Sequence, residues 1–110
     1  MVENVDPTAK DIEENKAISV LAYLGILVLV PLLAKKESPY AQYHAKQGLV
    51  LLIAWIAILI VGIIPILGWI ISIVGTIVLL VFMIIGIVNA VSGQTKELPI
   101  IGKYGDKFNL

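Results

Sequence analysis

The residues that could carry out chemistry gather in one short polar stretch, residues 35–47. Within it Tyr40, Tyr43, His44 and Gln47 stand at positions i, i+3, i+4 and i+7, so a helix would present them on one face. His44 is the single histidine of the chain, and histidine can bind a metal or titrate near neutral pH. The simplest expectation is that His44 forms a hydrogen bond, at the membrane surface, with a carbonyl group of a loop or tail.

The rest of the sequence gives little support for a metal, a cofactor or a catalytic centre. Zinc needs three or four ligands, and the chain has no cysteine and no second histidine. The hydroxyl groups of the apolar segments belong to Ser19, Tyr23, Ser72 and Thr76, and none has a general base near it in sequence. The sequence also lacks a phosphate-binding loop and a carboxylate pair. We therefore expect no enzyme activity, no catalytic residue, no metal and no cofactor.

The longest feature of the chain is a run of 49 positions between Lys46 and Lys96 without a charged residue. As one helix this run would extend about 73 Å, more than twice the roughly 30 Å of a bilayer's hydrocarbon core. The run must therefore cross a lipid bilayer twice and turn between the two crossings. Residues 65–68 predict that turn, because Pro65 stops the preceding helix and Gly68 relieves the backbone.

The apolar segments predict an all-α membrane protein with three transmembrane helices. The first covers residues 17–34, whose 18 positions are enough to cross a bilayer. The second belongs to a helix over residues 39–64, which starts with Ser38 as N-cap and Pro39 at the first helical position. Its first turns form an interfacial helical extension. The third covers residues 69–91 and forms a tight helical hairpin with the second.

This division predicts an acidic N-terminal tail (residues 1–16), a three-helix transmembrane domain (17–93) and a polar, interfacial C-terminal tail (94–110). We expect the C-terminal tail to lie at the membrane interface or to pack against the face of residues 39–47. With three crossings, six lysines lie on the side of the 35–47 loop and the C-terminal tail, and two lie on the other side. The positive-inside rule then places the N-terminus outside and the C-terminus in the cytoplasm.

Small residues recur at helical spacing in the third span and would let helix backbones approach closely in lipid. They are Gly68, Ser72, Gly75, Thr76, Gly86 and Ala90. The simpler interpretation is packing against the second span, and the alternative is a face for a homo-oligomer. Trp55, in the middle of the second span, would contact another span or line a site for a lipid or hydrophobic ligand. The spans hold no ionisable group, which argues against a proton-coupled transporter or an ion pore within one protomer.

Two stretches resemble a known family of small bacterial and archaeal membrane proteins. Residues 38–49, SPYAQYHAKQGL, are similar to the family's "SPF…H-x-K-x-(A/G)-L" segment, and residues 98–102, LPIIG, resemble its ending. This Tic-twenty-like family is related to the Tic-twenty component of the chloroplast inner-envelope import machinery and includes a magnetosome-membrane branch. The motif positions are Ser38, Pro39, Tyr40, Tyr43, His44, Lys46 and Gln47. The chloroplast protein has four spans against three expected here, so the resemblance does not imply a channel.

Taken together, these patterns favour a non-enzymatic scaffold or assembly factor of an inner or plasma membrane, linked to protein transport or membrane biogenesis. Its expected partners are the lipid bilayer and a second copy or another membrane protein. Eight basic and eight acidic residues give a net charge of zero, which does not support a nucleic-acid partner. Two alternatives stay open: a subunit of an oligomeric protein-translocation channel, and a binder of lipid or of a hydrophobic ligand.

Overall fold

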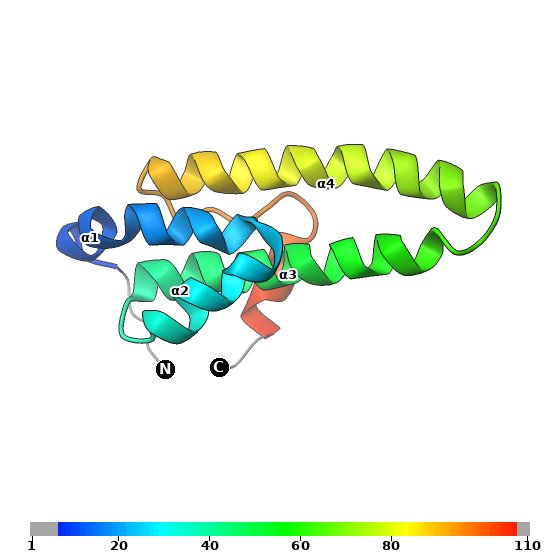
Figure 1. Cartoon of the computed structure of the whole chain (residues 1–110). Helices are drawn as coiled ribbons and strands as arrows, with labels where there is room; N and C mark the ends of the chain where they lie inside the picture. Colours follow the sequence, from blue (N-terminus) through cyan, green and yellow to red (C-terminus); the bar gives the residue numbers. More distant parts are fainter. Residues whose placement is uncertain (1–6, 108–110) are drawn as a thin grey trace.

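A computed structural model of the chain describes residues 7–107, and every regular element in these residues is helical. The all-α prediction is therefore confirmed for this part of the chain. In chain order the elements are α1 (Ala9–Val20), the short 3-10 helices η1 (Leu21–Tyr23) and η2 (Gly25–Val28), α2 (Leu29–Ala34), α3 (Pro39–Val61), α4 (Leu67–Val91) and the 3-10 helix η3 (Gly102–Lys107) (Figure 1). The outer parts of the two predicted tails, residues 1–6 and 108–110, lie outside the described residues.

The two longest helices, α3 and α4, form the predicted helical hairpin and lie side by side (Figure 1). α3 begins as predicted, because the Ser38 side chain accepts a hydrogen bond from the N–H of Ala41 and Pro39 occupies the first turn. The helix ends at Val61, and α4 starts at Leu67, so the turn is slightly longer than predicted. Within the described residues, α3 and α4 are the helices that are long and apolar enough to cross a membrane.

Residues 17–34 do not form one membrane-crossing helix, so that prediction is wrong. After Val20 the chain passes into the two 3-10 helices, reverses at Leu24 and Gly25, and returns as α2 (Figure 1). Gly25 has a φ of 68°, in the left-handed region that glycine enters without steric cost. Pro31 falls in the first turn of α2, where a helix tolerates proline, rather than near the end of a long span.

We call residues 9–34, from α1 to α2, the N-terminal hairpin. It packs beside the first half of α3 and the second half of α4. A Cβ atom added to Gly48 of α3 would overlap the carbonyl oxygen of Ala22, and one added to Gly86 of α4 would overlap the ring of Tyr23. Glycine at these two positions lets the tip of the N-terminal hairpin approach both long helices closely.

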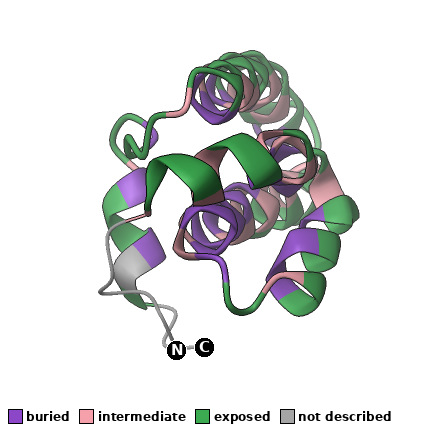
Figure 2. Cartoon of the chain, turned by 90° about the vertical axis from the view of Figure 1, so that its left-hand side faces the viewer, coloured by how far each residue is buried: buried purple, intermediate pink, exposed green. Residues whose placement is uncertain are grey.

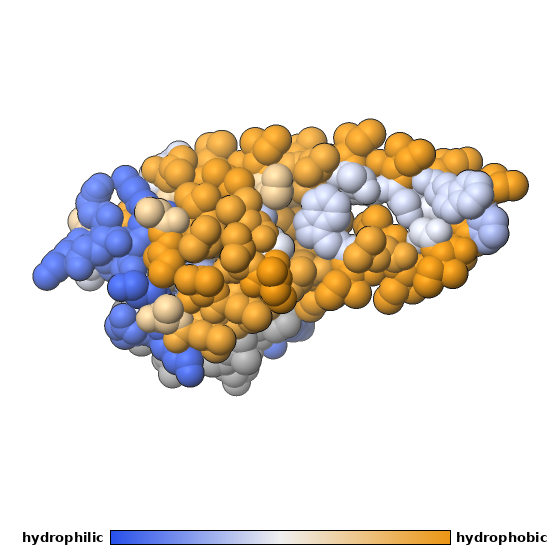
Figure 3. Space-filling view, viewed as in Figure 1, coloured by the Kyte–Doolittle hydropathy of each residue, from blue (hydrophilic) through white to orange (hydrophobic). Residues whose placement is uncertain are grey.

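The reversal of the N-terminal hairpin brings the start of α1 and the end of α4 to the same end of the molecule. Gly93, just after α4, lies against the side chains of Ile12 and Lys16. Hydrophilic residues gather at this end, which we call the polar end, and apolar residues cover most of the remaining surface (Figure 3). The expectation that the two tails lie on opposite sides of a membrane rested on three membrane crossings. Because residues 17–34 do not form one crossing helix, that expectation is no longer supported. α1 also runs across the predicted boundary between residues 1–16 and 17–93.

The buried core lies in the half of the molecule nearest the polar end. All buried residues of α3 fall between Tyr40 and Leu51, and apart from Gly68 those of α4 fall between Leu79 and Ala90. Seen from the polar end, buried residues lie where the helices face one another (Figure 2). The core cluster consists of Ala22, Tyr23, Val28, Leu32, Ala45, Leu51, Leu79, Phe82, Ala90 and Leu98. The far half of the α3–α4 hairpin exposes large apolar side chains on its surface, as contact with lipid requires.

Candidate functional site

The polar residues at the start of α3 are buried inside the protein. Tyr40 and His44 are 0% exposed, and Gln47 is 2% exposed. Tyr43 is partly exposed and packs edge-on against the His44 ring. The expectation that the first turns of α3 form an interfacial extension is therefore wrong for Tyr40, because the N-terminal hairpin and residues 94–107 surround the start of α3. We call the buried polar side chains of Ser38, Tyr40, Gln42, His44 and Gln47, with their bonding partners, the polar cluster.

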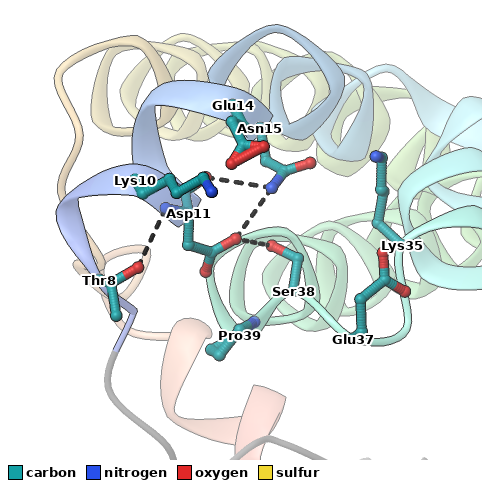
Figure 4. Close-up of a pocket in the computed structure, with 9 residues that line it drawn as sticks. All are labelled: Thr8, Lys10, Asp11, Glu14, Asn15, Lys35, Glu37, Ser38 and Pro39. Atoms are coloured by element: carbon teal, nitrogen blue, oxygen red, sulfur yellow. Dashed lines mark hydrogen bonds between the residues drawn. The ribbon is translucent and has the colours of Figure 1, made fainter.

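Ser38, the N-cap of α3, is held by Asp11 of α1 (Figure 4). The Ser38 hydroxyl donates to Asp11 Oδ1 at 2.5 Å, and Asp11 Oδ2 accepts from the N–H of Tyr40 at 3.0 Å. Asn15 Nδ2 donates to the same carboxylate at 2.8 Å. A carboxylate beside the first N–H groups of a helix is stabilised by the helix dipole, so Asp11 caps α3 from another helix. Asp11 was not among the predicted site residues, because no local sequence pattern reveals this distant contact.

Tyr40 and Gln42 bond to the ends of two other helices. The Tyr40 hydroxyl donates to the carbonyl oxygen of Ala90, near the end of α4, at 2.5 Å. Gln42 Nε2 lies 3.0–3.2 Å from three carbonyl oxygens at the end of α2, those of Pro31, Leu32 and Lys35. Carbonyl groups at the end of a helix can accept bonds from outside that helix, and Tyr40 and Gln42 donate to them from α3. Gln42 was not among the predicted site residues, although it lies inside the motif stretch.

His44 uses both ring nitrogens for hydrogen bonds within the protein. Its Nε2 lies 2.8 Å from the carbonyl oxygen of Gln94, which can only accept, so Nε2 carries the hydrogen. In the neutral ring Nδ1 then accepts from the hydroxyl of Tyr23, 2.5 Å away. The predicted bond to a tail carbonyl is confirmed, but the predicted place is wrong, because His44 is buried inside the protein rather than at the membrane surface. Within the described residues no group of three or more His, Cys, Asp or Glu side chains is placed to hold a metal ion.

Gln47 fastens the segment that follows α4. Its Oε1 accepts from the N–H of Leu98 at 2.9 Å, and its Nε2 donates to the carbonyl oxygen of Gly102 at 2.8 Å. Lys46, the next motif residue, is 6% exposed and lies under the same segment, close to Gly105. The prediction that the residues after α4 pack against the face of residues 39–47 is confirmed for the part that the structure describes.

The polar cluster therefore joins five segments around the first three turns of α3. Ser38 bonds to α1, Tyr40 to α4 and Gln42 to α2. His44 bonds to η1, and Gln47 bonds to the segment after α4. Because these side chains are buried and engaged with one another, the arrangement offers structural hydrogen bonding rather than a site open to a substrate.

The small residues of α4 face other parts of the same chain. An added Cβ at Gly68 would overlap the Val61 carbonyl, and one at Gly75 would overlap the side chain of Ile58. The Ser72 hydroxyl donates to the carbonyl oxygen of Ile58 at 3.3 Å. These contacts favour packing within one chain over a homo-oligomer face.

The other small residues of α4, Gly86, Ala90 and Thr76, differ in how far they are buried and in what they contact. Gly86 adjoins the ring of Tyr23, and Ala90 is fully buried. Thr76 is partly buried. Trp55 of α3 packs against the core cluster, which agrees with the first of its two predicted roles, contact with another span.

Two kinds of hollow occur on the surface. A polar hollow of about 400 Å³ lies between α1 and the start of α3, and its lining carries charges of both signs, including Asp11, Glu14 and Lys35 (Figure 4). Two apolar grooves, of about 380 and 400 Å³, adjoin one another beside the middle of α3 and share the residues Ala54, Ala57 and Ile101. In the polar hollow the Ser38 hydroxyl lies beside the Asp11 carboxylate, and this pair is engaged in capping α3.

Comparison with known proteins identifies the family. The model of the magnetosome magnetite crystal formation protein family, MamF/MmsF, matches residues 14–104, which include every residue of the polar cluster except Asp11. The chain belongs to the MamF/MmsF family. A magnetosome protein MamF from Paramagnetospirillum magneticum is 34% identical over 84 residues, which cover 76% of each chain. A magnetosome protein MmsF from the same organism is 35% identical over 84 residues, which cover 76% of this chain and 78% of the relative.

A second MamF, from Magnetospirillum gryphiswaldense, is 60% identical over a shorter stretch of 30 residues, 27% of each chain. No solved structure matches the chain. Membership of the MamF/MmsF family confirms the magnetosome branch of the predicted resemblance, and it identifies the chain as a membrane protein of a family named for magnetite crystal formation. The comparisons do not extend to Tic-twenty or to protein import, so that part of the resemblance stays a prediction.

Proposed function

We propose that this protein is a multi-pass protein of the magnetosome membrane and acts in magnetite crystal formation as a non-enzymatic scaffold or assembly factor. The observation that carries the proposal is the family match over residues 14–104, which extends from α1 to η3. The match is supported by relatives named magnetosome proteins MamF and MmsF that align over most of their length.

A scaffold role agrees with the way the chain uses its polar groups. The motif side chains bond to other segments of the same chain, and exposed large apolar side chains occur in the second half of α3 and along the whole of α4. The motif residues, on this proposal, hold the fold together at the polar end. The exposed apolar surface of the long helices is then available to contact lipid and neighbouring membrane proteins.

The arrangement of the helices also supports a specific topology. α3 and α4 cross the membrane, and the N-terminal hairpin enters and leaves the bilayer from the same side. Six of the eight lysines of the chain then belong to segments at the polar end, the other two belong to η3 beside α3, and the turn between Val61 and Leu67 carries no charge. The positive-inside rule places the polar end, with both tails, in the cytoplasm. This replaces the expectation of an external N-terminus.

Complementation tests the function. The chain would be expressed in a Paramagnetospirillum magneticum strain whose MamF and MmsF genes have been removed, and crystal sizes would be measured by electron microscopy. We expect the size distribution to move back toward that of the parent strain and a fluorescent fusion to align with the crystals. An expressed, membrane-inserted protein that leaves the crystals unchanged would contradict the proposal.

Single cysteines test the topology, because the natural chain has none. Lys10→Cys in α1 and Ile64→Cys in the turn would each be treated with a membrane-impermeant maleimide from the outer face of the cytoplasmic membrane. With two crossings Ile64→Cys is labelled and Lys10→Cys is protected until the membrane is opened. With three crossings and an external N-terminus Lys10→Cys is labelled at once, and the proposed topology fails.

A further inference from the structure

The molecule is much wider at one end than at the other. Around the first half of α3 and the second half of α4, the N-terminal hairpin and η3 add further helical segments (Figure 1). Beyond Leu51 of α3 and before Leu79 of α4 the N-terminal hairpin is absent, and Gly68 is the one buried residue of the two long helices there. Ile101, after α4, reaches the middle of α3 at Ala54 and Ala57, and the turn end of the α3–α4 hairpin lies beyond it. With helices about 10 Å across, the four helices α1 to α4 at the polar end and the two long helices at the turn end differ about twofold in cross-section.

The N-terminal hairpin reaches a depth that corresponds to one leaflet. Tyr40 bonds to the carbonyl of Ala90, so the start of α3 is level with the end of α4. The tip of the N-terminal hairpin adjoins Gly48 of α3 and Gly86 of α4. At 1.5 Å per residue, Gly48 lies about 12 Å from Tyr40 and Gly86 about 6 Å from Ala90 along their helices. Since a hydrocarbon core is roughly 30 Å thick, the tip ends at or before the bilayer midplane.

The outer surface of the N-terminal hairpin requires lipid around it. Ile26 is 65% exposed and Leu33 is 61% exposed, and other large apolar side chains of the same segment are exposed as well. Lysines stand at both ends of this apolar segment, Lys16 before it and Lys35 and Lys36 after it, where their amino groups can reach the headgroups. The hairpin therefore occupies the leaflet at the polar end and adds no volume to the other leaflet.

We propose that the protein is a one-sided membrane wedge that favours curved bilayers in which the leaflet holding the polar end is convex. A convex leaflet has more area for each inserted group, and insertion into one leaflet makes binding depend on curvature. The partner is the phospholipid bilayer itself, and the property concerns membrane shape rather than crystal formation. It follows from the unequal depth of the N-terminal hairpin and the α3–α4 hairpin.

Membrane tethers pulled from giant vesicles test the wedge. Full-length protein carrying Thr95→Cys, at the polar end, would be labelled with a fluorophore and reconstituted in both orientations. A membrane-impermeant quencher then separates molecules with the polar end outside from those with it inside. In the tether, whose outer leaflet is convex, we expect enrichment of the first population over the flat membrane and depletion of the second. Equal densities in tether and flat membrane, or the opposite sign, would overturn the proposal.

Two variants test whether the N-terminal hairpin causes the preference. Gly48→Leu would push the tip away from α3, because its side chain meets Ala22 and Val28, and the enrichment should be lost. Ala17→Leu adds the same side chain at an exposed position of α1 and should keep the enrichment. Retained enrichment in a folded, inserted Gly48→Leu protein would count against the hairpin as the cause. If Gly48→Leu does not fold, the comparison of the two orientations of the otherwise natural chain still decides the proposal.

Discussion

The hydrogen bond between Tyr23 and His44 joins the tip of the N-terminal hairpin to α3, and its strength can be measured as a coupling free energy. The hydroxyl oxygen and Nδ1 are 2.5 Å apart, and both side chains are 0% exposed. Tyr23→Phe removes one hydroxyl with little change of volume and leaves Nδ1 without a donor. His44→Leu removes two bonds and leaves the Tyr23 hydroxyl and the Gln94 carbonyl without a partner.

The structure allows the size of each loss to be worked out. A buried polar group that loses its partner costs about 1–3 kcal/mol, so we expect Tyr23→Phe to lower the free energy of unfolding by about 1–2 kcal/mol and His44→Leu by about 2–4 kcal/mol. In the double variant only the Gln94 carbonyl is left unpaired, so its loss is smaller than the sum of the single losses. Double-mutant cycles in a membrane protein average about 0.6 kcal/mol and reach about 1.7 kcal/mol. Because both groups are fully buried, we expect a coupling of about 1–1.7 kcal/mol.

Unfolding in mixed detergent micelles with increasing dodecyl sulfate, followed by far-ultraviolet circular dichroism, would give the four free energies. The control is a second cycle that combines Tyr23→Phe with Ser72→Ala, since Ser72 bonds to Ile58 in the far half of the α3–α4 hairpin. Distant sites should be additive within about 0.3–0.5 kcal/mol. If the Tyr23 and His44 losses add as closely as those of the control, the inferred bond does not stabilise the protein and the reasoning is refuted.

Three further substitutions test other contacts. Gln47→Ala removes two bonds to the segment after α4 and should speed trypsin cleavage after Lys96, whereas a rate equal to that of the natural chain would contradict the role of Gln47. Gly48→Leu overpacks the hairpin tip and should lower the free energy of unfolding by about 1–3 kcal/mol or more, measured in the same micelles. Ser72→Leu should separate α3 from α4 near the turn and lower the midpoint of thermal unfolding in detergent, and an unchanged midpoint would count against that contact.

Features that depend on local composition could be predicted from the sequence. The charge-free run after Lys46 requires lipid and a turn, and Ser38 followed by Pro39 marks the start of α3, because each signal lies in neighbouring residues. The bond from His44 to a tail carbonyl was also predictable, since a lone buried histidine must find a partner. Asp11 was not, because its role is to cap a helix that starts 27 residues later in the sequence.

The sequence by itself determined that the chain is a helical membrane protein, because its long charge-free run is too apolar for water. It also determined that α3 and α4 form a hairpin, because that run is too long for one crossing. Only the tertiary structure decided the course of residues 17–34. A straight span and a reversed hairpin have the same apolar composition, and what separates them is contact with distant residues, Gly48 and Gly86, which leave room for Ala22 and Tyr23. That choice brings the start of α1 beside the end of α4 and makes the molecule wider at the polar end.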